Sequence, residues 1–297
     1  MGSEMCIRDS PSREKMRLII VSGRSGSGKS TALSVLEDAG FNCIDNLPAI
    51  LLNQIVDDTL SNFNQDEVGL AICVDARNKS LAKFSDLFEQ IDREKIDCEL
   101  IYFDAVNETL LKRFSATQRP HPLTNSSVDL QEAINLESDF LEKISEKADL
   151  RVDTSALTEK DLRKLVVERI VRNERTKMNL AIYSFGYKHG VPIDADYVFD
   201  ARCLPNPYWV RELRAFSGLD KPVIDFLGSQ KLVGEMIGDI SNYLSKWISY
   251  FEEYNRLYLT IAIGCTGGQH RSVYVAERLA EALEIDSKIT TTRHREL

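Results

Sequence analysis

The sequence lacks the segments that mark membrane and secreted proteins. No apolar run approaches the roughly 20 residues that a membrane-spanning helix needs. No stretch has the basic, apolar and small-residue order of a secretory signal. We therefore expect a cytoplasmic protein with no membrane partner.

Cysteine is sparse and arranged without pairs. None of the six cysteines belongs to a C-x-x-C pair, and their spacing does not match that of metal ligands. They are Cys6, Cys43, Cys73, Cys98, Cys203 and Cys265. Such scattered residues are typical of reduced thiols in the cytosol and argue against a disulfide framework.

Positive charge is in short supply overall, which argues against a protein coated in nucleic acid. The net charge of the 297 residues is −9. From Arg172 onward, however, 16 basic residues balance 16 acidic ones, so the whole excess of negative charge lies before that point. If a polyanion binds this chain, we expect it to bind in the second half.

Length and composition allow two hydrophobic cores, since 43% of the residues are hydrophobic. Residues 1–15 carry no apolar periodicity, and we interpret them as a non-native-looking leader outside the fold. We expect a first domain over residues 16–168 and a second domain over residues 169–297.

Apolar strands and amphipathic helices alternate along the chain. The first pair is a strand at Met16–Ser22 and a helix at Lys29–Ala39, which Gly40 would cap. Further strands are expected at Phe41–Ile44, Gly69–Val74, Leu100–Phe103, Leu150–Val152, Ala181–Phe185, Asp196–Phe199 and Leu257–Ile263. Helices are expected from Glu159 to Glu174, over a long stretch to Tyr254, and through Leu283. The alternation predicts an α/β fold class with a doubly wound parallel sheet.

A glycine-rich turn separates the first strand from the first helix. It consists of Gly23, Arg24, Ser25, Gly26, Ser27, Gly28, Lys29 and Ser30, which match G-x-x-x-x-G-K-[ST] in full. The glycines let successive backbone N–H groups converge on one anion at a helix N-terminus. The motif predicts binding of ATP or GTP with Mg²⁺. Lys29 would contact the β and γ phosphates, and the Ser30 hydroxyl would ligate the metal.

The residues that complete this nucleotide site are less narrowly defined by the sequence. A carboxylate at a strand end is needed near the magnesium, and Asp75 and Asp104 both qualify. Asp45 follows the second strand, where small-molecule kinases of this architecture often hold a carboxylate. Each of the three could equally be a plain strand-terminating residue. A basic lid over the phosphates would come from Arg113, Arg119 and His121. A solvated loop is an equally good interpretation of that last segment.

A second glycine-rich turn, GCTGGQHRS, runs from Gly264 to Ser272 between an apolar strand and a helix. Its N–H groups, together with Thr266 and Arg271, suit a phosphate monoester or a nucleic-acid phosphate. The same segment fits the C-x-x-G-x-x-R-[ST] loop of cysteine phosphatases, whose thiolate is a nucleophile. Because Gly264 replaces the usual histidine before Cys265, we favour an anion pocket without covalent chemistry.

Basic residues gather near the end of the chain, where a frayed terminus and an RNA phosphate contact are both possible. The candidates for RNA contact are His270, Arg271, Lys288, Arg293 and Arg295.

Six segments together resemble the RapZ/YvcJ family of bacterial nucleotide-binding proteins. They are GRSGSGKS, DNLP, DARN, FGYKHGVPIDADYVFD, LPNP and GCTGGQHRSV. The resemblance runs from Met16 almost to the end of the chain. It implies a P-loop domain like that of small-molecule kinases, with weak ATPase and GTPase activity. It also implies a second α/β domain reminiscent of a phosphofructokinase subdomain.

The resemblance further implies partners and site residues. Members of the enterobacterial-type branch bind small regulatory RNAs, present one to ribonuclease E, sense glucosamine-6-phosphate and assemble as tetramers. Carried over by position, the residues for GTP are Asp75, Ala76, Arg77 and Asn78. The residues for the sugar phosphate are Asp200, Cys265, Thr266, Gly268, His270, Arg271 and Ser272.

Two departures from that branch concern RNA. Gln269 stands where the branch tends to carry lysine, and the chain stops at Leu297, where the branch continues into a basic tail. Each lost phosphate contact weakens salt-dependent RNA affinity. Taken as a whole, the resemblance implies an RNase adapter that regulates small-RNA decay and amino-sugar synthesis. A P-loop small-molecule kinase, or an NTPase without an RNA role, is the alternative.

Overall fold

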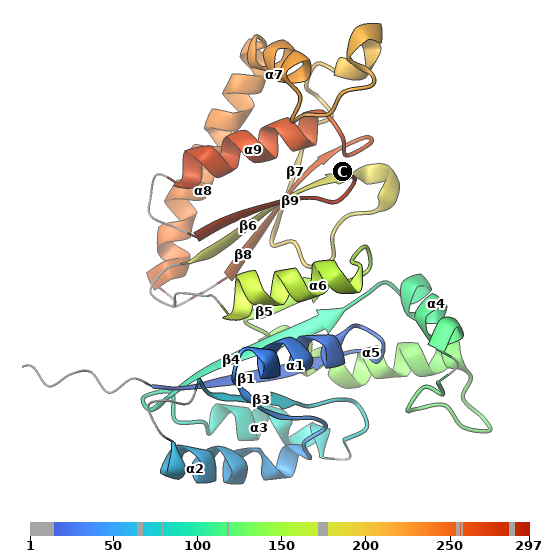
Figure 1. The fold of residues 1–297 in the computed structure, drawn as a ribbon, viewed down its shortest axis with the longest axis vertical. Coiled ribbons are helices and arrows are strands. Elements are labelled where there is room, and N and C mark those ends of the chain that lie inside the picture. The colour runs from blue at the N-terminus through green and yellow to red at the C-terminus, as the bar shows by residue number, and fades with distance from the viewer. Residues whose placement is uncertain are drawn as a thin grey trace, which may run out of the picture.

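Two parallel β-sheets, each with its own helices, make up the fold (Figure 1). The computed structural model describes residues 15–63, 68–78, 80–117, 119–171, 178–253, 256, 258–284 and 289–297. Among them, no helix is both long enough and apolar enough to cross a bilayer.

The first sheet has five parallel strands in the order β2-β3-β1-β4-β5. The strands are β1 (Met16–Gly23), β2 (Asn42–Ile44), β3 (Leu70–Cys73), β4 (Ile96–Asp104) and β5 (Leu150–Asp153). The helices are α1 (Lys29–Asp38), α2 (Leu52–Asn62), α3 (Phe84–Glu89), α4 (Asn107–Thr117), α5 (Leu130–Lys147) and α6 (Glu159–Val166). The order confirms the predicted crossover connections of a doubly wound sheet.

Strand β1 is apolar on both faces because helices cover both sides of the sheet. Leu18 and Ile20 pack into a core closed by α2, α3 and α5. Their neighbours Ile19 and Val21 point the other way, into a core closed by α1 and α6. The period of two along the strand thus assigns alternate residues to two separate cores.

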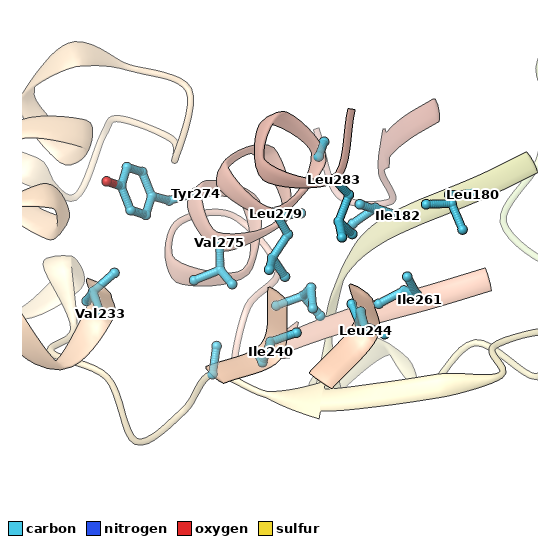
Figure 2. Packing of buried hydrophobic residues seen from close by; sticks show 14 of the residues in the cluster. Leu180, Ile182, Val233, Ile240, Leu244, Ile261, Tyr274, Val275, Leu279 and Leu283 are labelled. Carbon is cyan, nitrogen blue, oxygen red and sulfur yellow. The ribbon is translucent and has the colours of Figure 1, made fainter. Parts of the chain in front are cut away.

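The second sheet has four parallel strands in the order β7-β8-β6-β9. They are β6 (Asn179–Gly186), β7 (Tyr197–Asp200), β8 (Tyr258–Cys265) and β9 (Ile289–His294). Helices α7 (Lys221–Gly228), α8 (Lys231–Glu253) and α9 (Arg271–Glu284) lie against one face. Figure 2 shows Leu279 and Leu283 of α9 beside Ile182 of β6, above Ile240 and Leu244 of α8.

Secondary structure differs from the expectations at three places. Of the two possibilities left open for the chain end, the frayed terminus is excluded, because Ile289–His294 forms strand β9 and pairs with β6 along its whole length. The helix expected from Glu159 to about Glu174 is α-helical to Val166 and continues as one π turn at Val167–Val171, while residues 172–174 lie outside the described residues. The long helical stretch is two helices, since α7 ends at Gly228.

The two sheets meet through buried polar contacts. Tyr258, at the start of β8, lies in the core of the first sheet, and its hydroxyl donates to Glu99 Oε2 at 2.9 Å. The Arg17 guanidinium donates to the Ile170 carbonyl oxygen at 2.9 Å, just after α6. Figure 1 shows α6 between the two sheets. This helix therefore contributes to the surroundings of both halves.

Candidate functional site

The first glycine-rich turn has a backbone that only glycine fits. Gly23, Gly26 and Gly28 have φ angles of 139°, 81° and 102°, all in the left-handed region. A Cβ on Gly23 would lie 2.0 Å from the Phe103 carbonyl oxygen, so the loop can pass β4 only with glycine there. A Cβ on Gly28 would lie 2.5 Å from Leu162, where α6 closes on the loop. The turn is therefore an open backbone ring held between β4 and α6.

Lys29 spans this ring from the first turn of α1. Its Nζ donates to the Gly23 carbonyl oxygen at 2.7 Å and to the Arg24 carbonyl oxygen at 3.0 Å. Gly26 and Ser30 are exposed at the mouth of the ring. An ammonium group, a hydroxyl and a helix N-terminus thus face the same space, as a phosphate chain requires.

The Arg24 side chain turns away from this space. Its Nε and one terminal nitrogen donate at 2.6 Å to Asp104 Oδ1 and to Asn107 Oδ1, and the other bonds to the Ala105 carbonyl oxygen. Arg24 therefore holds the loop against the end of β4 and offers no charge to a phosphate. The same contacts occupy Asp104, whose pKa burial raises above its ordinary value. Asp45 and Asp75 line the cavity beside the loop and Asp104 does not, so these two remain candidates for the metal carboxylate.

Glu137 supports the loop, and sequence reasoning missed it. The carboxylate of this buried α5 residue accepts from the Ser25 N–H at 2.8 Å and from the Ser25 hydroxyl at 2.7 Å. His121 Nδ1 accepts from the Leu123 N–H at 3.2 Å, so Nε2 carries the proton that bonds Glu137 at 3.1 Å. Although burial opposes it, these bonds and the nearby Lys29 charge lower the pKa of Glu137.

A cavity of about 550 Å³ opens beside the ring. It extends from Lys29 and Ser30 to Asp45, Asp75 and Arg77. Its volume falls within the range of small-molecule and cofactor sites. Helix α6 and the turn before it form one wall, through Thr158, Glu159 and Leu162, which sequence reasoning also missed.

The DARN segment divides into two pairs. Asp75 and Arg77 line the cavity, and the Asp75 carboxylate accepts from the Arg77 N–H at 3.0 Å and from Arg77 Nε at 2.8 Å. Ala76 is buried, and the Asn78 amide donates to the Leu47 carbonyl oxygen at 3.0 Å. Ala76 and Asn78 therefore shape the turn, while Asp75 and Arg77 are placed to meet a ligand.

The three residues of the expected lid do not act together. Arg119 lines the cavity. Arg113 also lines it, but its guanidinium donates to the Gly26 carbonyl oxygen and to Thr154 Oγ1, both at 2.9 Å. His121 is buried against Glu137. Of the three, Arg119 alone thus has no hydrogen bond or ion pair with the residues that the structure describes.

The second glycine-rich turn closes around its own cysteine. Cys265 Sγ accepts from the Gly268 N–H at 3.2 Å and lies 3.1 Å from the Ser272 hydroxyl. Burial alone would raise the pKa of this thiol, but hydrogen bonds from Ser272, Gly268 and the His270 backbone outweigh it and lower the pKa. At least one loop amide expected to hold an external anion, that of Gly268, is therefore already bonded to the Cys265 sulfur.

Replacing this sulfur should destabilise the second half. We expect Cys265→Ala to lower the free energy of unfolding by about 2–4 kcal/mol, because it leaves several buried N–H groups without an acceptor. Cys265→Ser keeps an acceptor and should lose less. Urea unfolding of both variants measures the difference. Cys203→Ala, at an exposed thiol, is the matched control, and an equal loss there would contradict the explanation.

The other sugar-phosphate candidates are only partly assembled. Arg271 Nη2 lies 3.5 Å from Thr266 Oγ1, while its Nη1 donates to the Arg202 carbonyl oxygen at 2.8 Å. The His270 ring is buried 6.5 Å from the ring of Tyr208. Asp200 is held by the Arg202 guanidinium, which lowers the pKa of that carboxyl. Asp200 is therefore already paired, and it is ionised rather than poised to donate a proton.

The four described candidates for RNA contact belong to two segments of the second half. His270 and Arg271 belong to the second turn, and Lys288 lies outside the described residues. Arg293 and Arg295 line a cavity against α6 of the first half. The alternation along β9 explains the separation, because these two side chains leave the strand toward the first sheet.

Fold and loop together define the class. A parallel sheet in the order 2-3-1-4-5, with a G-x-x-x-x-G-K-S turn between its central strand and the first helix, makes the first half a P-loop α/β domain. The second half is another α/β domain with a glycine-rich turn after β8.

Comparison with known families gives the particular assignment. Residues 16–174 match the RapZ-like N-terminal domain, and residues 178–297 match the RapZ C-terminal domain. The chain belongs to the RapZ-like family, which confirms the resemblance drawn from its motifs.

Two curated relatives agree with this assignment. A nucleotide-binding protein of Pseudomonas putida is 53% identical over 95% of this chain and all of its own length. One from Stutzerimonas stutzeri is 54% identical over the same shares. A shikimate kinase from Acinetobacter baumannii, solved in complex with shikimate, is 16% identical, with a TM-score of 0.36 over 54% of this chain and 96% of its own.

Proposed function

We propose that this protein is a nucleotide-binding RNase adapter of the cytoplasm. Its first half binds ATP or GTP and hydrolyses it weakly. Its second half binds a small regulatory RNA, presents it to ribonuclease E, and responds to glucosamine-6-phosphate. In this way a homotetramer would regulate small-RNA decay and amino-sugar synthesis.

The cavity beside the first loop supports the nucleotide part of the proposal more than any other observation. Lys29, Ser30 and the amides at the start of α1 would hold the β and γ phosphates. Ser30, with Asp45 or Asp75, would hold Mg²⁺. The metal would neutralise charge that develops on the phosphates. The RNA and sugar-phosphate parts rest on membership of the family.

The test combines RNA binding with mapping. A small regulatory RNA should shift the full chain in a gel at physiological salt, with the affinity falling as salt rises. Ultraviolet crosslinks should map to residues 178–297, and glucosamine-6-phosphate should change the affinity. Absence of a shift, or crosslinks confined to residues 16–174, would refute the adapter role and leave nucleotide binding untouched.

One observation favours a second function, that of a small-molecule kinase. Asp45 follows β2 and lines the same cavity as Lys29, where it could activate an acceptor hydroxyl. A kinase predicts that some metabolite raises ATP turnover many-fold and that Asp45→Asn removes that rise. If turnover stays slow with every metabolite tried, the adapter role is preferred.

A further inference from the structure

A second cavity, of about 370 Å³, lies between the two halves. One wall is α6 with the π turn that follows, and the other is the β9 strand with its continuation to Leu297. Figure 1 shows α6 at this boundary. No motif of the sequence pointed to this place, and neither glycine-rich turn contributes to its lining.

Strand register determines which side chains enter the cavity. Arg293 pairs with Tyr183 of β6, and both residues line the cavity. The ring of His294, one residue later, leaves the opposite face of the sheet, where it lies 3.2 Å from Glu277 of α9. Arg295 returns to the side of Arg293. Alternation thus sends two arginines toward α6.

The cations in this cavity have unused hydrogen-bonding capacity. Arg293 forms no hydrogen bond or ion pair with any residue that the structure describes. Arg169, only 2% exposed, has one terminal nitrogen without a partner, and so has Arg295. A buried guanidinium that lacks acceptors is costly, so the arrangement calls for an anion.

Three acidic groups nearby already have partners, while the buried Asp194 has one carboxylate oxygen without a hydrogen-bond partner among the described residues. Asp161 closes the N-terminus of α6, where its carboxylate accepts from the Thr158 hydroxyl at 2.7 Å and the Thr158 N–H at 3.1 Å. Glu168 lies 3.7 Å from Lys164 on the same helix. Asp153 approaches Arg295 to 3.8 Å. Arg293 is close enough to Asp161, and Arg169 to the buried Asp194, for their charges to interact, but neither pair forms a hydrogen bond or ion pair among the described residues.

We propose that this interdomain cavity binds a small phosphate ester, held by Arg293, Arg295 and Arg169. Guanidinium groups from two directions can give a phosphate several charge-assisted hydrogen bonds. The volume suits a sugar phosphate or a mononucleotide and is too small for an RNA helix.

Helix α6 connects this site to the nucleotide cavity. Glu159 and Leu162 face the nucleotide cavity, while Asp161 and Lys164 face the interdomain cavity. A ligand that fixes the helix on one side alters the wall of the other cavity. Occupancy of the interdomain site should therefore change nucleotide affinity in the wild type, within the roughly 5- to 150-fold range of such couplings.

Calorimetric titrations of the full chain test the site, with Lys29→Ala present throughout to weaken the first phosphate loop. The probes are inorganic phosphate, AMP and glucose 6-phosphate, and the two esters separate a nucleotide source from a sugar source. We expect Arg293→Gln to weaken the tightest of the three about tenfold or more. Arg293→Lys should lose less because it keeps the charge. Arg211→Gln, at an exposed arginine of the same half, should have no effect.

The thermal midpoint of Arg293→Gln should stay near that of the parent, because the side chain forms no hydrogen bond or ion pair with the described residues and has only charge interactions with Asp161 and Tyr183 to lose. An affinity for all three probes that does not depend on Arg293 would overturn the site. An equal loss with Arg211→Gln would do so too. So would a result in which Arg293→Gln weakens RNA binding and leaves the small esters unchanged.

Discussion

Lys29→Ala should raise the Kd for ATP or GTP about 100-fold or more. In the structure Nζ is held by two carbonyl oxygens of the loop, those of Gly23 and Arg24. This places the charge at the front of the ring before any ligand arrives. The ammonium would then reach the β and γ phosphates with little rearrangement, and alanine offers neither the charge nor the donors.

Fluorescence titration with a labelled nucleotide measures this change. Lys143→Ala, at an exposed lysine of α5, removes the same charge at a distance and should leave the Kd unchanged. The unfolding free energy of Lys29→Ala is measured alongside, because this variant also loses two hydrogen bonds of the loop and a positive charge near Glu137. Equal affinities of the Lys29→Ala and wild-type proteins would show that nucleotide binds elsewhere or not at all.

The first glycine-rich loop could be predicted from the sequence because the residues that define it are adjacent in the chain. Eight successive residues carry the glycines, the lysine and the serine, and a buried strand and an amphipathic helix flank them. Strand-helix alternation also predicted the class of fold. The hydrophobic cores on both faces of β1 confirm that prediction. Both signals are local, so a single sequence reveals them.

Glu137 shows why the supporting residues could not be found in the same way. It lies 112 residues from Ser25, on a helix whose polar residues look like an ordinary solvated face. Only the packing of α5 against β4 and β1 brings its carboxylate to the loop. For the same reason the sequence could not show that Arg24 turns toward Asp104.

Strand β9 was not predicted from the sequence, for a different reason. Its residues, ITTTRH, include no apolar alternation, because one face meets the polar boundary between the two halves. The run of three threonines, β-branched residues that favour strands, was the available signal. Recognising it would have placed Arg293 and Arg295 on one face and His294 on the other.

Glu137→Ala should be among the most destabilising single substitutions in the first half, with a loss of about 3–5 kcal/mol in the free energy of unfolding. It leaves the Ser25 N–H, the Ser25 hydroxyl and the His121 Nε2 proton without their acceptor in a buried place. Glu137→Gln keeps one oxygen and should lose less. Chemical unfolding measures both, and Glu142→Ala, at an exposed glutamate of the same helix, should be near neutral.

The pH dependence gives this prediction its sharpest form. Because the pKa of Glu137 is lower in the folded protein than the roughly 4.3 of an unfolded chain, the unfolded state binds more protons between those two values. The stabilisation by the ionised Glu137 carboxylate is therefore complete above the pKa of the unfolded state. It is lost as the pH falls through the pKa of the folded state. Glu137→Gln cannot titrate, so its unfolding free energy should fall less steeply than the wild type's below about pH 4.5. If the unfolding free energies of the two proteins fall in parallel with pH, the Glu137 carboxylate is not ionised where it contacts the loop.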